Sequence, residues 1–120
     1  MEELNFLIET EREALENIAK ANGDFKEFYK DGNIEIENRY VVNLWLLEKE
    51  LETLHPDISK FENIKYINIS HNNLKTLPQK SIEELMKKPG MRIDAVKNNF
   101  DEETKEFLEK MSKKYLWIYY

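Results

Sequence analysis

Two histidines are the first candidates for chemistry in this sequence, because imidazole ligates metal ions and transfers protons near neutral pH. His55 precedes Pro56, and His71 precedes Asn72. A metal or catalytic site needs an acidic or second histidine side chain at ligand spacing, and neither histidine has such a companion in the sequence. We therefore expect both histidines to have structural or solvent-exposed roles.

Acidic runs are the second candidates, because clustered carboxylates can bind metal ions. They occur at Glu48, Glu50 and Glu52 and at residues 101–103, where a solvated face or a helix N-terminus explains them more simply. The sequence also has no glycine-rich phosphate loop, H-E-x-x-H motif or nucleophile elbow. We expect no enzyme, no cofactor and no metal site.

Aromatic and arginine side chains are the remaining candidates, and their chemistry is that of protein recognition. Trp, Tyr and Arg are enriched among the residues that dominate binding energy at protein interfaces. Several occur in short β-prone segments, including Trp45, Tyr66 and Trp117. Which of them share a surface depends on the strands that carry them, and a repeat in the sequence predicts those strands.

A pattern of large aliphatic residues recurs at an offset of 23 positions. The two copies read L-x-x-L-x-L-x-x-N-x-L-x-x-L, with Lys49 at the asparagine position of the first. The first contains Val41, Leu44, Leu46, Leu51, Leu54 and Ile58, and the second contains Ile64, Ile67, Ile69, Asn72, Leu74 and Leu77. A weaker third copy, offset by 26, contains Gly90, Ile93, Ala95, Asn98 and Phe100. Repeats of this period are typical of stacked solenoids.

The second copy, which ends at Leu77-Pro78, resembles a leucine-rich repeat of the 23-residue bacterial type. About three such repeats of 23–26 residues span residues 41–116, and the match is clearest over 41–100. The resemblance implies a curved, mainly parallel sheet on a concave side, and protein binding without chemistry of its own. The repeated asparagine, here Asn72 and Asn98, is expected to satisfy backbone groups where the chain leaves each strand.

The 120 residues predict one α/β domain, a short leucine-rich-repeat solenoid with an N-terminal helical cap and a C-terminal helix plus strand. The cap covers residues 1–40, with an amphipathic helix over 2–21, a further helical turn over 24–29 and a strand over 34–37. A helix is expected over 81–88 with Ser81 as its N-cap, and another over 101–114. Residues 115–120 are predicted to add a last strand, or else to form an apolar tail that docks on the core or on a partner.

Strand alternation then predicts which side chains face the concave surface. The predicted partner-binding residues are Asn43, Trp45, Leu47, Tyr66, Asn68, Arg92, Asp94, Trp117 and Tyr119. This register requires Leu116 and Ile118 to point inward. Two alternatives stay open: Trp45 and Trp117 cover each other or are covered by the N-terminal segment, or the C-terminal register is shifted by one, which buries Trp117 and exposes Leu116.

The formal net charge is −6, and residues 1–40 carry all of it. Direct nucleic-acid binding is not expected, because it requires clustered Lys and Arg. The absence of cysteine, of a secretory signal and of a long apolar run predicts no membrane association and a location in the cytoplasm of the producing cell or of a host.

The leading functional hypothesis is a non-catalytic module that grips a protein partner with its concave sheet. One alternative is a small phage-type inhibitor that binds a host defence effector, such as a CRISPR nuclease, at stoichiometric ratios through the acidic residues Glu9, Glu11, Glu13 and Glu16. Another is a homodimer through the concave face. An enzyme with no recognisable motif is the remaining hypothesis.

Overall fold

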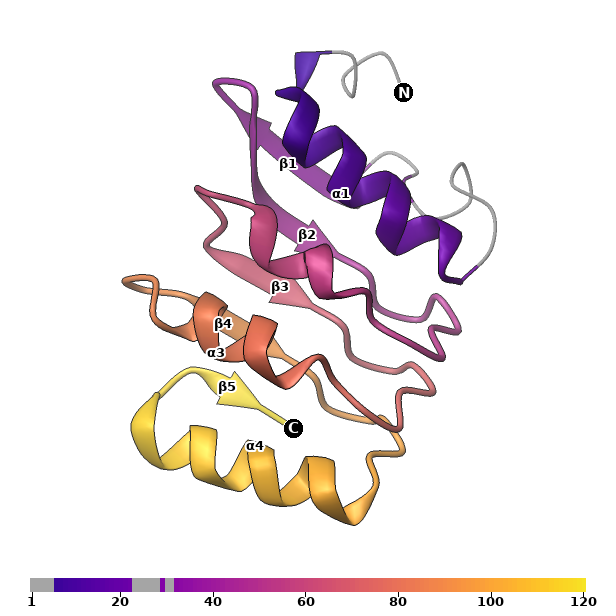
Figure 1. Ribbon diagram of the computed structural model, residues 1–120, viewed down its shortest axis with the longest axis vertical. Coiled ribbons are helices and arrows are strands. Elements are labelled where there is room, and N and C mark those ends of the chain that lie inside the picture. The colour runs from indigo at the N-terminus through magenta and orange to yellow at the C-terminus, as the bar shows by residue number, and fades with distance from the viewer. Residues whose placement is uncertain (1–5, 23–28, 30–31) are drawn as a thin grey trace.

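The computed structural model describes residues 6–22, 29 and 32–120. Five strands form one sheet in the order β1-β2-β3-β4-β5. β1 (Ile34–Glu37) pairs antiparallel with β2 (Tyr40–Trp45). β3 (Tyr66–Asn68), β4 (Arg92–Asp94) and β5 (Ile118–Tyr119) are then added in parallel (Figure 1). The strand predicted over 34–37 is confirmed, and the C-terminal segment ends in a sheet strand.

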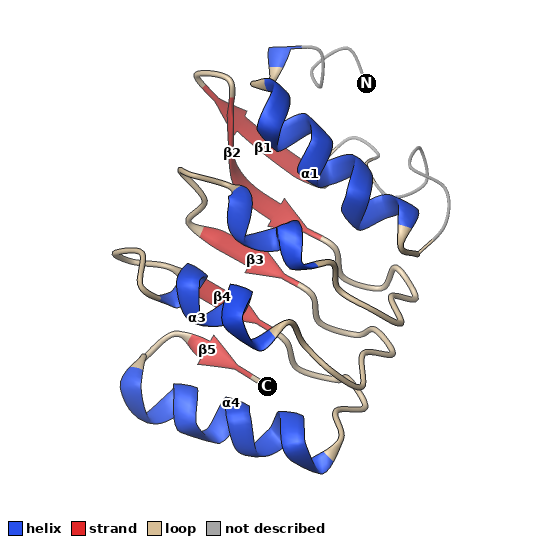
Figure 2. Ribbon diagram, in the orientation of Figure 1, coloured by secondary structure: helices blue, strands red, loops and turns tan. Residues whose placement is uncertain are grey.

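Three α-helices and a 3-10 helix cover one face of this sheet within the described residues. They are α1 (Glu9–Lys20), the 3-10 helix η2 (Pro56–Lys60), α3 (Gln79–Met86) and α4 (Glu102–Lys114). Figure 2 shows α1, η2 and α3 lying over the strands on one side, and α4 running alongside β5 at the edge of the sheet. The protein is therefore a small, compact α/β domain with a mostly parallel sheet. None of the helices in the described ranges is long and apolar enough to cross a bilayer.

The repeated aliphatic positions form the core between the sheet and the helices. Strand pairing aligns Leu44 with Ile67, Ile67 with Ile93, and Ile93 with Ile118. All four side chains are buried in one continuous cluster, which also receives Leu15 from α1. Burying each such side chain stabilises the fold by about 1.5–3 kcal/mol, so the aliphatic repeat is the main determinant of the packing.

The repeated asparagines satisfy backbone groups at the strand exits, as expected. We call this series of contacts the asparagine ladder, and Asn72 makes the most of them. The Asn72 side-chain oxygen accepts hydrogen bonds from the backbone N–H groups of Lys49 and Leu51, at 2.9 and 3.0 Å. Its Nδ2 donates to the carbonyls of Leu46 and Ile69. Asn72 thus joins its own turn to the turn of the preceding copy, and it serves the turn in which Lys49 replaces an asparagine.

Asn98 repeats this arrangement one copy later. Its oxygen accepts from the Leu74 N–H at 3.1 Å, and its Nδ2 donates to the carbonyls of Ile69 and Ala95. Asn22, from the N-terminal segment, makes similar contacts with the first copy of the repeat. Its side-chain oxygen accepts hydrogen bonds from the backbone N–H groups at positions 52 and 53. The Asn22 contact was not predicted from the repeat.

The first helix begins later than its apolar spacing predicts. α1 starts at Glu9 rather than at residue 2, and residues 2–5 lie outside the described residues. Ile8 is extended, and its N–H donates to the Arg39 carbonyl at 3.1 Å, which ties the chain to the β1–β2 turn instead of continuing the helix. The helical turn predicted over 24–29 lies outside the described residues except for Tyr29, whose buried hydroxyl donates to the Leu15 carbonyl.

The other two α-helices follow local signals to different degrees. The helix predicted over 101–114 is confirmed, and the Asp101 side chain caps it by accepting from the Thr104 N–H at 2.8 Å. The prediction of Ser81 as an N-cap is wrong, because α3 begins at Gln79. Ser81 is instead buried in the first turn, and its hydroxyl donates to the Pro56 carbonyl at 2.8 Å.

Candidate protein-binding face

The predicted partner-binding residues lie mostly in two rows on the face of the sheet that no described helix covers. The first row aligns Asn43, Tyr66 and Arg92 across β2, β3 and β4. The second row aligns Trp45, Asn68, Asp94 and Tyr119 across four strands. These residues alternate with buried core positions, so their side chains point away from the helices. Leu47 and Trp117 flank the strands, after β2 and before β5.

Four side chains of these rows touch one another in series, and we call them the sheet-face cluster: Trp45, Tyr66, Arg92 and Tyr119. Trp45 packs edge-on against Tyr66, with ring centroids 6.2 Å apart and an interplanar angle of 62°. The Arg92 guanidinium carbon lies 5.3 Å from the Tyr66 ring centroid and 5.3 Å from the Tyr119 ring centroid. The arginine is therefore stacked between tyrosines of the two neighbouring strands, within the range of a cation–π attraction.

Asn68 supports this cluster from the second row. Its Nδ2 donates to the Tyr66 hydroxyl at 3.0 Å, which fixes the position of that ring. Its oxygen accepts from the Ser70 hydroxyl at 2.6 Å and from the Ser70 N–H at 2.9 Å. Ser70, two positions further along, is buried, and its hydroxyl is held by this contact with the Asn68 side chain.

The C-terminal part of the face differs from its prediction at one residue. Leu116 was expected to point inward, but it is 84% exposed, because residues 116–117 form a turn and the strand begins only at Ile118. The alternative register that buries Trp117 is also wrong, since Trp117 is 48% exposed. Tyr119 is 39% exposed, so this end of the face presents large aromatic surface.

The histidines occupy structural positions. His55 is the N-cap of η2, and its Nδ1 accepts a hydrogen bond from the Asp57 N–H at 3.0 Å. His71 is exposed and has a positive φ of 55° at the exit of β3. Within the part of the chain that the structure describes, no group of three or more His, Cys, Asp or Glu residues could hold a metal ion.

Glu11 is one of the acidic residues assigned to the inhibitor hypothesis, and the structure corrects that assignment. Its carboxylate is buried and accepts from the Val41 N–H at 2.7 Å and from the Glu62 N–H at 3.1 Å. Desolvation raises the pKa of Glu11, and the two accepted hydrogen bonds oppose that rise only in part. Glu11 therefore joins α1 to the sheet, and Glu9, Glu13 and Glu16 remain nearer the surface.

Asp57 makes the matching connection from η2. Burial alone would raise the pKa of Asp57, but a hydrogen bond from Asn17 and the nearby Lys60 ammonium outweigh burial and lower it. The Asn17 Nδ2 donates to the Asp57 carboxylate at 2.8 Å. This ionised carboxylate holds α1 against η2 and does not point to a reaction.

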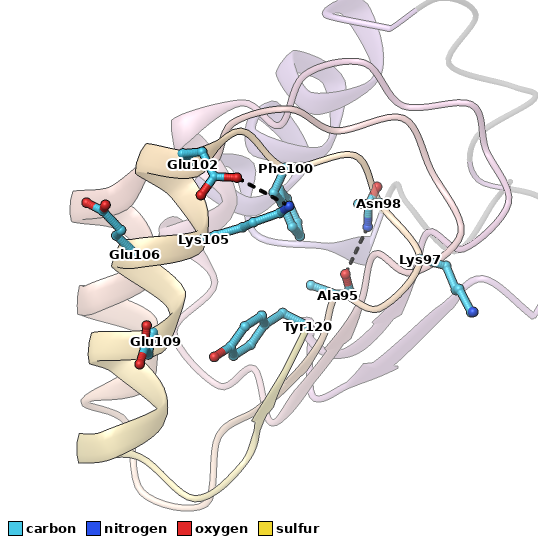
Figure 3. Close-up of a pocket in the computed structure, with 9 residues that line it drawn as sticks. All are labelled: Ala95, Lys97, Asn98, Phe100, Glu102, Lys105, Glu106, Glu109 and Tyr120. Atoms are coloured by element: carbon cyan, nitrogen blue, oxygen red, sulfur yellow. Dashed lines mark hydrogen bonds and ion pairs between the residues drawn. The ribbon is translucent and has the colours of Figure 1, made fainter.

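A cavity of about 360 Å³ lies between α4 and the end of the sheet. Its charged lining residues carry both signs, and Glu102 and Lys105 already form an ion pair at 3.7 Å. Figure 3 shows Tyr120 inside this space, whereas Lys97 and Glu106 point away from it. No polar groups converge on one point in the cavity, so it presents a weaker candidate site than the sheet face.

Comparisons with protein-family models, with curated proteins and with solved structures found no match for this chain.

Proposed function

We propose that this protein is a non-catalytic binding module that grips a protein partner with the helix-free face of its sheet. The observation that carries the proposal is the sheet-face cluster, in which Asn68, on the same face, holds the Tyr66 ring by a hydrogen bond to its hydroxyl. Aromatic rings and an arginine fixed by their neighbours lose little freedom on binding, and such side chains supply most of the energy at protein interfaces. Trp45 and Tyr66 are partly exposed and Tyr119 is exposed, so the cluster offers aromatic surface of the kind that often marks an interaction site.

We also propose that the domain is a short solenoid of the leucine-rich-repeat type. Three features support this: the aliphatic offset of 23 positions, the alignment of Leu44, Ile67 and Ile93 across parallel strands, and the equivalent contacts of Asn72 and Asn98. In such a fold the helix-free face is the concave one. Stacked repeats use that face to hold extended partner surfaces.

A protein fits this face better than a polyanion does. The net charge of −6 and the single arginine of the two rows offer no basic track for a phosphate backbone. A broad sheet surface without a deep cavity suits a macromolecular surface rather than a small molecule.

The test is affinity capture from cell lysate with mass spectrometry. Three baits are compared: the wild type, a Trp45→Ala/Tyr66→Ala double variant, and a control variant, Lys80→Ala/Glu83→Ala, with its substitutions on the exposed side of α3. Unfolding curves first establish that all three baits are folded. A prey held by the wild type and the control but lost from the double variant supports the proposal, and a second copy of the chain behaving in this way would identify a homodimer. A prey held equally by all three baits would place the interface elsewhere and refute the proposal.

A further inference from the structure

Arg92 is exposed on the sheet face in β4, and its guanidinium donates no hydrogen bond to any residue that the structure describes. Tyr66 and Tyr119 contact it through their ring faces, at 5.3 Å on each side. A guanidinium has five N–H donors in a rigid plane. Stacking restricts the orientation of that plane and leaves the donors available, so Arg92 is prepared for a partner that accepts hydrogen bonds.

No carboxylate of the described residues forms an ion pair with Arg92, although Asp94 is two positions further along the same strand. The Asp94 carboxylate has one long contact, to the Val96 N–H at 3.5 Å. Residues two apart in a strand share a face at a spacing of about 6.6 Å. The face therefore presents a cation and an anion two positions apart, and within the described residues neither of them forms an ion pair.

The charges of Arg92 and Asp94 together favour some classes of partner over others. A guanidinium in this setting binds a carboxylate or a phosphate through two parallel hydrogen bonds. The neighbouring Asp94 repels a polyanion such as a nucleic acid, and so does the net charge of −6. A protein segment can instead supply an anion for Arg92 together with a cation for Asp94.

We propose that the partner presents an extended segment with an acidic residue and a Lys or Arg two positions away, the acid bound by Arg92 and the cation by Asp94. Side chains two apart on an extended segment lie on one face at the spacing of Arg92 and Asp94, which makes the two charge patterns complementary. The inference rests on the proposed function of the sheet face, and it specifies which charged side chains of the partner that face recognises.

The experiment selects a display library of random linear peptides on the full chain. Enriched peptides are synthesised, and their affinity is measured by fluorescence polarisation for the wild type and for the variants Arg92→Lys, Arg92→Gln, Asp94→Asn and Trp45→Ala. Arg92→Lys separates the effect of charge from that of geometry, because it keeps the positive charge and removes the planar guanidinium. Unfolding curves establish that each variant is folded.

The expected result is enrichment of peptides with an acidic residue and a Lys or Arg two positions apart. Their affinity should fall about tenfold or more with Arg92→Lys and Arg92→Gln, and Asp94→Asn should remove the preference for the cation. Peptides that bind Arg92→Gln as well as wild type, but are lost with Trp45→Ala, would overturn the inference and leave the proposed function standing. Enrichment of purely basic peptides, or of none, would overturn the inference as well.

Discussion

Asn72 concentrates more backbone contacts than any other side chain of the ladder described above. Its oxygen accepts two hydrogen bonds, and its Nδ2 donates to three carbonyls. Asn98 accepts one and donates two. A buried backbone group that loses its partner costs about 1–3 kcal/mol, so the two asparagines should differ in their contribution to stability.

We expect Asn72→Ala to lower the free energy of unfolding by about 2 kcal/mol or more, and Asn98→Ala to lower it by roughly half as much. Urea unfolding followed by circular dichroism measures both. The exposed Asn73 supplies a matched control through Asn73→Ala. Equal losses at positions 72 and 98 would mean that the additional contacts of Asn72 contribute nothing net.

Glu11 predicts a pH dependence with a defined sign. Because desolvation raises its pKa above the ordinary value of 4.5, the folded protein binds this proton more tightly than the unfolded chain does. The contribution of Glu11 to stability is therefore fully present below the unfolded pKa and is lost as pH rises through the folded pKa. We expect the wild type to lose stability relative to Glu11→Gln as pH rises above the ordinary value of 4.5 and through the raised pKa of Glu11.

Urea unfolding of both proteins across this range measures the difference. Asp57 and Asp101 have lowered pKa values, so their opposite effects fall below this window. A difference between wild type and Glu11→Gln that stays constant with pH would contradict the assignment.

At the scale of elements, the residues that follow β2, β3 and β4 share a left-handed backbone conformation, which their residue types would not predict. Glu48, His71 and Lys97 have φ values of 55°, 55° and 60°, and they are separated by the same 23 and 26 positions as the aliphatic repeat. A left-handed conformation is unfavourable for a residue with a Cβ atom, and glycine adopts it freely.

His71→Gly should therefore raise the free energy of unfolding by up to about 1 kcal/mol. Lys75→Gly is the control, because Lys75 is exposed and is not among the positive-φ residues. Thermal and urea unfolding measure both variants. Destabilisation by His71→Gly would show that the imidazole has a stabilising role that its exposed position does not indicate.

β5 supplies the second prediction at this scale. Ile118 is buried beside Ile93, whereas Leu116, two residues earlier, is exposed. Ile118→Ala should cost about 2–4 kcal/mol, and Leu116→Ala should change stability by less than about 0.5 kcal/mol. Urea unfolding distinguishes the two, and similar effects would mean that the C-terminal segment does not pack as a strand of the sheet.

These elements also show which features of the fold and of the candidate face could be predicted from the sequence. The extent of α4 and the burial of the aliphatic repeat follow from local signals, namely the Asp101 cap and the regular spacing of large side chains. The start of α1 depends on the Ile8 contact with Arg39, which is distant in sequence and leaves no local pattern. Much of the candidate face was predicted because strand alternation is geometric. The burial of Ser70 and the exposure of Leu116 depend on contacts and turns that alternation does not encode.

At the scale of the whole molecule, the two sides of the sheet have different tasks. The helix side contains the continuous apolar core and the buried carboxylate of Glu11. The other side carries the sheet-face cluster and the charges of Arg92 and Asp94, which form no ion pair with any residue that the structure describes. Under the proposed function, substitutions on the helix-free face would alter binding while the core keeps the fold.

The most direct measurement is site-specific photo-crosslinking in cells. A photoreactive phenylalanine analogue is placed at Asn43, on the sheet face beside Tyr66, in one protein and at Glu83, on the outer side of α3, in another. The account predicts a cross-linked protein partner from position 43 and none of the same mass from position 83. The same partner cross-linked from position 83 alone would contradict the claim that the helix-free face is the binding surface.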